Sequence, residues 1–377
     1  MKIVIAPDSF KESLNASEVA LVIEKGIRRA DVHADIIKMP LADGGEGTVK
    51  ALVDSADGTM IEHTVTGPLG KEIRASYGVI DEKIAVIEIA AAAGLDSISE
   101  EERNPLATTT YGVGELILHA LDQGIRQFLI GLGGSGTNDG GIGMAQALGA
   151  EIVDKNGEPV SFGGTGLAEV HHISTQRMDA RLKDCTFEVA CDVNNPLTGP
   201  TGASYIYGPQ KGADKDMVAR LDQAMEKYGQ TIKAELGVDV SETEGAGAAG
   251  GLGAGFIAFL DAKLKRGIEL ISEMTNIESY IKDADVVITG EGKLDDQTVY
   301  GKTPAGVAKI AKKHDVPVIA ITGANQVTNQ GIYEAGIDAI FSIANGPMSL
   351  EESLIKSEWL IENLSENLMR LIIHMKN

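Results

Sequence analysis

Cysteine, aromatic residues and long apolar runs are all scarce in this chain of 377 residues. Its two cysteines, Cys185 and Cys191, have neither the Cys-x-x-Cys spacing of a zinc or redox site nor the pattern of a disulfide framework. The apolar run that ends at Pro7 is too short for a signal peptide, and no later run reaches the roughly 18 residues of a membrane span. These absences predict a protein of the reducing cytoplasm.

An excess of basic residues is also missing, since the formal net charge is −22 and the pI is near 4.7. Nucleic acids and anionic membranes bind to positively charged surfaces, so we expect neither as a partner. A small anion can still bind such a protein if backbone amides, a few lysines and a divalent cation reverse the field locally. The composition therefore favours a small anionic substrate accompanied by Mg²⁺.

Several catalytic signatures are absent too. The seven histidines are scattered, and no Gly-x-Ser-x-Gly elbow accompanies them. Lys302 and Thr303 resemble the end of a Walker A loop, but Asp296 stands where the first glycine of that loop belongs. The sequence thus predicts neither a serine hydrolase nor a P-loop protein.

Both ends of the chain alternate between short Val/Ile-rich strands and helices, which is typical of parallel β-α-β units. A capping box of Asn15 and Glu18 predicts a helix to about Ala30, and another at Ser349 and Glu352 predicts a long final helix. We expect the final helix to bury one apolar stripe: Leu354, Trp359, Leu360, Leu364 and Leu368.

The middle of the chain has hairpin-like patterning around a turn at residues 67–70. We therefore predict an α/β protein in which residues 1–65 and 280–377 form a Rossmann-like parallel-sheet domain. Residues 66–279 would form an inserted second α/β domain. Ligands of open parallel sheets bind beyond the carboxyl ends of the strands, so the loops at those ends are the candidate site.

Residues 131–143, called here the glycine loop, follow an apolar strand and combine glycines with small hydroxyl residues. Backbone N–H groups approach phosphate oxygens closely where side chains are absent. The predicted phosphate ligands are Gly133, Gly134, Ser135, Gly136 and Thr137, with Asp139 holding a metal ion. The alternative is a tight strand-to-helix turn whose glycines serve only packing.

Other loops add carboxylates and lysines. After the terminal strands come Asp8, Ser9 and Lys11, then Asp43, then Glu291 and Asp296. In the inserted segment, the position of Asp192 suits either a general base or a helix cap, and Lys211 is a candidate phosphate ligand. Residues 245–255 match the Gly-x-Gly-x-x-Gly pattern, but no strand precedes them, so helix packing is an equal alternative. Together these groups suit phosphoryl transfer to a small hydroxyl compound.

Seven ordered segments across essentially the whole chain resemble the glycerate kinase type 1 family: residues 6–13, 40–48, 132–141, 191–197, 208–213, 245–253 and 289–292. The resemblance implies a two-domain fold with a Rossmann-like part, ATP and Mg²⁺ as cosubstrate and cofactor, and D-glycerate as acceptor. It favours 2-phosphoglycerate over 3-phosphoglycerate as the product.

We accordingly assign roles from the chemistry. Asp192 or Asp43 would accept the hydroxyl proton, with Lys11 assisting at the catalytic centre. Asp8, Ser9 and Lys11 would bind glycerate, and Glu291 and Asp296 would hold the metal. Two alternatives remain open: an NAD-dependent hydroxy-acid dehydrogenase, and a small-anion binding protein without turnover.

Overall fold

The computed structural model describes residues 1–10, 12–41, 47–56, 58–296, 298, 302–328 and 330–376. Their contacts divide the chain into two compact units. Unit 1 comprises Met1–Asp43, Lys50–Ala56 and Ile268–Asn377, and unit 2 comprises Gly44–Val49 and Asp57–Gly267. No helix in these described ranges is both long and apolar enough to cross a membrane.

Unit 1 contains a parallel sheet with the strand order β13-β12-β11-β1-β2. The strands are β1 (Lys2–Pro7), β2 (Asp35–Lys38), β11 (Val286–Asp295), β12 (Val318–Gln326) and β13 (Ala339–Ser342). From β1 the chain continues to the neighbouring β2, whereas β11, on the other side of β1, leads to β12 and β13. The order of connections therefore reverses between β1 and β11.

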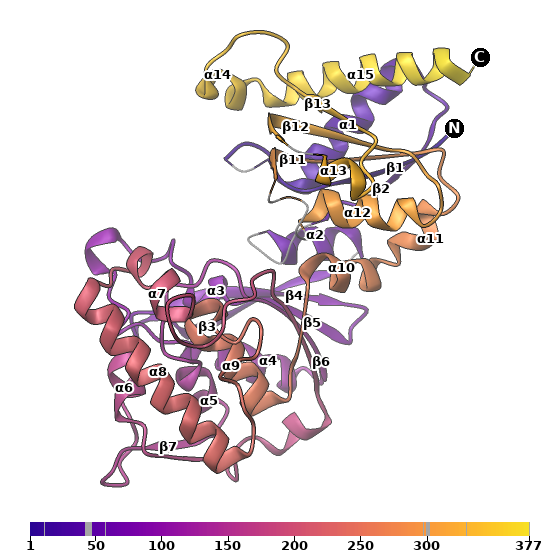
Figure 1. Cartoon of the computed structure of the whole chain (residues 1–377). Coiled ribbons are helices and arrows are strands. Elements are labelled where there is room, and N and C mark those ends of the chain that lie inside the picture. Colours follow the sequence, from indigo (N-terminus) through magenta and orange to yellow (C-terminus); the bar gives the residue numbers. More distant parts are fainter. Residues whose placement is uncertain are drawn as a thin grey trace. The chain divides into compact units, whose positions relative to one another are not determined.

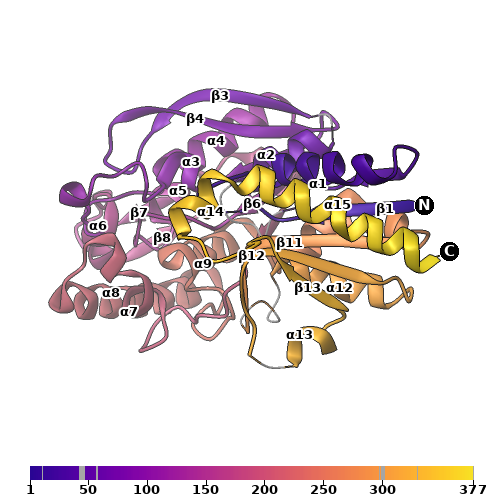
Figure 2. The ribbon, with the colours of Figure 1, turned by 90° about the horizontal axis from the view of Figure 1, so that it is seen from above.

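Helices cover both faces of this sheet (Figure 1). The helices that follow or precede its strands are α1 (Ala16–Ala30), α10 (Gly267–Thr275), α11 (Ile277–Ile281), α12 (Thr303–Lys312), α13 (Gly331–Glu334), α14 (Leu350–Ile355) and α15 (Ser357–Lys376). Helices α1 and α15 lie side by side on one face (Figure 2), where Gly26 allows close contact with the backbone of Glu362. Helix α12 packs on β1 and β11 on the other face.

Unit 2 contains a mixed sheet with the strand order β10-β9-β6-β5-β4-β3 and a small antiparallel sheet of β7 and β8. Its strands are β3 (Thr59–Thr66), β4 (Glu72–Ile80), β5 (Ile84–Glu88), β6 (Gln127–Gly131), β7 (Glu151–Val153), β8 (His172–Ser174), β9 (Thr186–Ala190) and β10 (Lys263–Lys265). The β3-β4 and β4-β5 pairs are antiparallel, and β5, β6, β9 and β10 run parallel.

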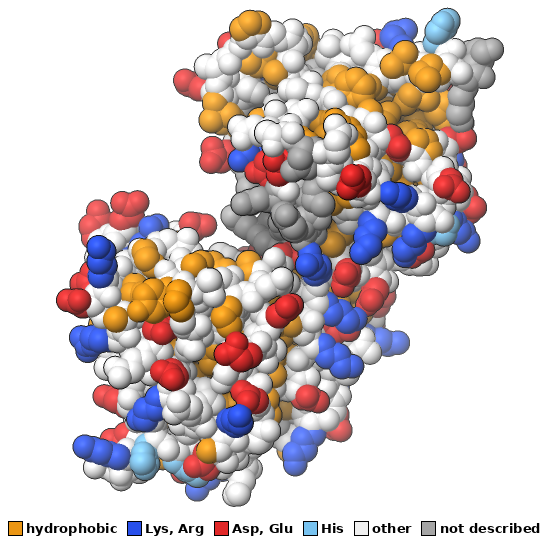
Figure 3. Space-filling model, in the orientation of Figure 1, with side chains coloured by type: hydrophobic (Ala, Val, Ile, Leu, Met, Phe, Trp, Pro, Cys, Tyr) orange, Lys and Arg blue, Asp and Glu red, His pale blue; other side chains and the backbone are white. Residues whose placement is uncertain are grey.

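The helices between these strands are α3 (Ala90–Ala93), α4 (Tyr111–Asp122), α5 (Ile142–Ala147), α6 (Gly163–Glu169), α7 (Ala203–Tyr207), α8 (Lys215–Leu236) and α9 (Ala248–Leu260). Helix α2 (Thr48–Ser55) precedes β3, and 3-10 turns occur at Glu100–Glu102, Ala180–Asp184 and Pro209–Lys211. On the face shown in Figure 3, acidic and basic side chains are interspersed on both units, despite the strongly negative net charge.

The predicted α/β class is confirmed. The Asn15–Glu18 capping box forms in both directions, and at Ser349 the side chain accepts the hydrogen bond from the Glu352 amide. Two expectations about the C-terminal segment are wrong. The final helix is interrupted at Lys356, giving α14 and α15, and Trp359 is 51% exposed rather than part of the buried stripe. Leu360 and Leu368 are buried as expected.

The contact units differ from the predicted division at residues 65/66 and 279/280. Strand β3 groups with unit 2 because it pairs along its whole length with β4. Most of α10 groups with unit 1, where Ile268 packs closely against Gly306 of α12.

Candidate active site

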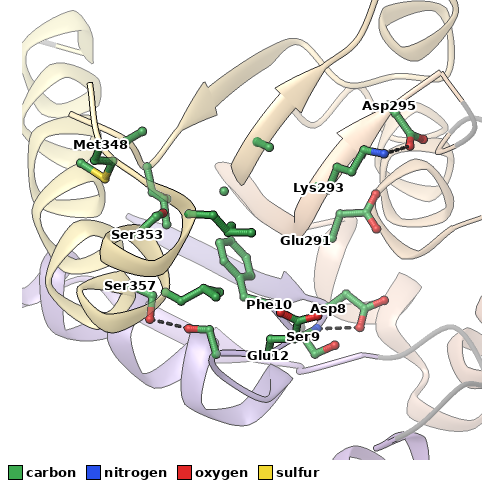
Figure 4. A pocket seen from close by; sticks show the side chains of 18 of the residues that line it. Asp8, Ser9, Phe10, Glu12, Glu291, Lys293, Asp295, Met348, Ser353 and Ser357 are labelled. Atoms are coloured by element: carbon green, nitrogen blue, oxygen red, sulfur yellow. Dashed lines mark hydrogen bonds and ion pairs between the residues drawn. The ribbon is translucent and has the colours of Figure 1, made fainter. Parts of the chain in front are cut away.

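A cavity of about 710 Å³ opens in unit 1 where β1, β11, β12 and β13 end. The C-terminal parts of β11 and β12 and the segments that follow β1 and β13 line it, and β1 and β11 are the two strands between which the connections reverse. Open parallel sheets bind their ligands at such a switch point. The topology therefore identifies this cavity as the candidate ligand site of unit 1 (Figure 4).

Three carboxylates mark one end of the cavity. Asp8, only 8% exposed, accepts hydrogen bonds from the Ser9 amide at 2.6 Å and from Thr303 Oγ1 at 2.8 Å. Glu291 accepts one from Thr298 Oγ1 at 2.8 Å. Asp295 pairs with Lys293 at 3.0 Å (Figure 4). The carboxylates of this charged end are thus held in place by donors of the chain.

Lys302 lies between two of these carboxylates, with Nζ 3.9 Å from Glu291 and 3.7 Å from Asp295. The acidic residues lining the cavity are Asp8, Glu12, Glu291 and Asp295, and the basic ones are Lys293 and Lys302. Four negative and two positive groups give a formal charge of −2. A phosphate chain can therefore bind in this cavity only together with a cation.

The opposite end of the cavity is apolar. Its apolar walls come from the segments after β1 and β13 and from α14: Phe10, Ile343, Met348, Leu350 and Leu354. In Figure 4, Met348 and Ser353 lie on the side away from Lys293 and Asp295, with Phe10 between the two groups. One cavity thus offers a charged surface and an apolar surface.

The residues predicted from the strand-end loops have different outcomes. Asp8, Ser9 and Glu291 line the cavity together. Asp296 instead accepts hydrogen bonds from the amide and hydroxyl of Thr328, with the amide at 2.9 Å. Lys11 and Asp43 lie outside the described residues.

Asp295 and Lys302 are cavity residues that the sequence reasoning did not select. Strand β11 extends to Asp295 because residues 293–295 pair with residues 324–326 of β12. The available signal for Lys302 was the Gly-Lys-Thr sequence at residues 301–303, which was set aside when the Walker A pattern failed.

The glycine loop of unit 2 is tied to its surroundings by backbone hydrogen bonds. The Gly136 amide donates to Ala93 at 2.8 Å, and the Gly134 carbonyl accepts from Leu95 at 2.8 Å. Ser135 and Thr137 are buried, whereas Gly134 is exposed. The loop is therefore a fixed turn whose accessible part lies near Gly134.

Lys211 is buried behind this loop, with 1% of the residue exposed. Its Nζ donates to the Thr137 carbonyl at 2.6 Å and to Ser135 Oγ at 2.9 Å. Burial lowers the pKa of the Lys211 ammonium to about 7, and the Asp139 charge partly opposes that decrease. In this geometry Lys211 supports the loop from within, and its predicted contact with a phosphate stays a prediction.

Asp139 is also fully buried. One oxygen accepts hydrogen bonds from the Thr110 amide at 2.8 Å and hydroxyl at 2.9 Å, and the other accepts one from the Gly141 amide at 3.0 Å. Burial raises the pKa of this carboxyl group, which the hydrogen bonds partly offset. Because both oxygens already face donors of the chain, the geometry favours a structural role over the predicted metal role.

Asp192 is exposed after β9, and its Oδ1 accepts a hydrogen bond from the Gly267 amide at 3.0 Å. Gly267 is the first residue of α10, so the contact caps this helix. The contact fits the helix-cap interpretation of Asp192, and its role as a base stays a prediction.

Comparison with known proteins adds independent information. The profile of the Glycerate kinase family matches residues 3–373. The chain belongs to the glycerate kinase family. It is 51% identical to a glycerate kinase of Halalkalibacterium halodurans, with 97% of each chain covered, and 50% identical to glycerate 2-kinase of Escherichia coli K12 over the full length of both. A crystal structure described as glycerate kinase 2 from Salmonella typhimurium LT2 matches with a TM-score of 0.91 and 48% identity, covering 100% of this chain and 99% of that one.

Membership of the glycerate kinase family gives no support to the dehydrogenase alternative, which rested on residues 245–255. The structure shows why glycines occur there. A Cβ atom on Gly250 would lie 2.0 Å from the Thr137 carbonyl oxygen, and one on Gly255 would lie 2.9 Å from the Gly140 carbonyl oxygen. These glycines let the start of α9 pack directly on the glycine loop.

Proposed function

We propose that this chain transfers the γ-phosphate of ATP to D-glycerate and releases ADP and 2-phosphoglycerate. The observation that carries the proposal is the full-length match to the glycerate kinase family, at about half identity to its relatives. The position of the phosphorylated hydroxyl is taken from the name of the Escherichia coli relative, glycerate 2-kinase.

Mg²⁺ is part of this proposal because the charged end of the unit 1 cavity is acidic. The described residues contain no cluster of three or more metal-ligating side chains. Mg²⁺ is usually held by one or two carboxylates together with substrate phosphates and water, so such a cluster is not required. Glu291 and Asp295, which flank Lys302, fit this role best, and Asp296 is engaged with Thr328. Bound Mg²⁺ would neutralise charge on the phosphates.

The remaining roles follow from the chemistry of the acceptor. Ser9, at the charged end of the cavity, and Lys11 would bind the glycerate carboxylate. Asp192 or Asp43 would accept the proton of the attacking hydroxyl. The glycine loop exposes only the backbone around Gly133 and Gly134, because Ser135 and Thr137 are buried, so it is a poorer candidate for the phosphates than the charged end of the unit 1 cavity.

A coupled ADP-release assay tests this proposal. We expect ADP release that requires D-glycerate, ATP and Mg²⁺ together, with little release when propionate replaces glycerate. Propionate keeps the carboxylate but has no hydroxyl group to accept the phosphate. NADH formation from glycerate and NAD⁺ without ADP release would reject the kinase, and binding of glycerate without any turnover would favour the anion-binding alternative.

A further inference from the structure

We propose that the apolar end of the unit 1 cavity binds the purine base of ATP, with the phosphates extending toward Glu291 and Lys302. This inference rests on the proposed kinase function, because ATP is the substrate that carries both an apolar ring and an anionic chain. It assigns the nucleotide to the terminal parallel sheet, whereas the sequence had pointed to the glycine loop of unit 2.

The size of the cavity supports a nucleotide. At about 710 Å³ it falls within the range of pockets that enclose drug-sized ligands, roughly 300–1,000 Å³. Glycerate is a three-carbon acid and would leave most of this space unfilled. The cavity also lies at the switch point between β1 and β11, and open α/β sheets bind nucleotides at such a point.

The distribution of chemistry along the cavity supports the same ligand. Glycerate has a polar group on every carbon, so it has no use for a wall formed by Phe10, Met348 and Leu354. A nucleotide presents a flat ring at one end and phosphates at the other, which matches the separation of apolar and charged side chains in Figure 4. The hydroxyl of Ser353, on the apolar side, is a candidate hydrogen-bond partner for the edge of the base.

Leu350 provides a separate observation. It is 73% exposed at the start of α14, yet it lines the cavity. Covering such a side chain with an aromatic ring removes apolar surface from water and stabilises the complex. Ile355, at the end of the same helix, is 77% exposed and does not belong to the cavity lining. The two residues therefore form a matched pair for an experiment.

The test compares two probes by calorimetry: ADP, which has a base, and inorganic triphosphate, which has none, each with Mg²⁺. We expect Ser353→Trp, which fills the apolar end, to raise the Kd of ADP by at least about tenfold, and Leu350→Ser to raise it several-fold. The Kd of triphosphate should stay within about twofold in both variants. Ile355→Ser should leave both values unchanged, and a thermal melt of each variant checks folding.

Steady-state kinetics separates this inference from the proposed function. If Leu350→Ser raises the KM for ATP and leaves the KM for glycerate unchanged, the base site is supported. If ADP affinity is unchanged in both variants, or if the KM for glycerate rises instead, the base site is wrong while the kinase function stands. If the wild type binds ADP at this end but phosphorylates no glycerate, the proposed function is wrong and the site remains.

Discussion

Lys211 is a cation enclosed by the protein, and its titration has a consequence for stability. Its pKa falls from an ordinary value of 10.5 to about 7 in the folded chain because of burial. Between these pH values the unfolded chain binds a proton that the folded chain does not, so the free energy of unfolding rises with pH. Below about pH 7 Lys211 is protonated in both states, so it no longer makes the free energy of unfolding depend on pH.

We predict that the wild type gains stability relative to Lys211→Met as the pH rises from 7 toward 10. Urea unfolding of both proteins at several pH values measures the difference, in which the other titrating groups largely cancel. Lys227→Met, an exposed site on α8, is the control and should follow the wild type. Parallel curves for wild type and Lys211→Met would show that Lys211 does not titrate in this range.

Single residues also show where sequence reasoning ends. The pattern of glycine, serine and threonine before Asp139 correctly marked a specialised loop, but the same pattern suits a phosphate cradle and a buried turn. Distinguishing them requires knowing that Lys211 and Thr110, distant in the sequence, donate into the loop. Such contacts depend on tertiary packing, which the local pattern does not contain.

At the scale of elements, Asp192 links the end of β9 to the start of α10 through its contact with Gly267. Asparagine keeps an oxygen that can accept this hydrogen bond but cannot act as a base at neutral pH. If Asp192 is the general base, Asp192→Asn should lower kcat by about 10²- to 10⁴-fold and leave the thermal midpoint nearly unchanged. Steady-state kinetics and a thermal melt check the two effects.

Asp214 offers a matched control, because it caps α8 in the same unit by accepting a hydrogen bond from the Met217 amide at 2.8 Å. Asp214→Asn should retain both stability and turnover. If Asp192→Asn keeps wild-type turnover, Asp43 becomes the candidate general base. If Asp43→Asn also keeps wild-type turnover, neither carboxylate is the base.

The elements themselves were largely predictable where the signal is local. The Asn15–Glu18 capping box identified α1, and the turn at residues 67–70 identified the hairpin of β3 and β4. The full length of β11 was not predictable, because Gly290, Glu291 and Gly292 have low strand propensity, and pairing with β12 on both sides of Gly292 carries the strand on to Asp295. The exposure of Trp359 likewise depends on how α15 lies against α1.

At the scale of the whole molecule, the regular alternation of strands and helices predicted the α/β class, and the ordered motifs predicted the family. The boundaries of the two units were harder to predict, because they are defined by contacts between segments that are distant in the sequence. Strand β3 belongs to the same unit as its partner β4, although almost all of β3 lies before the predicted boundary at residues 65/66. The cavity at the β1–β11 switch point follows from strand order, which the sequence alone did not specify.

The central claim is that this chain phosphorylates the 2-hydroxyl group of D-glycerate with ATP. Phosphorus NMR of the product tests it directly, because a phosphate on carbon 2 couples to one proton and a phosphate on carbon 3 couples to two. We predict a doublet from 2-phosphoglycerate, appearing together with the signals of ADP. A triplet from 3-phosphoglycerate would contradict the assigned position, and the absence of any phosphoglycerate signal would contradict the kinase function itself.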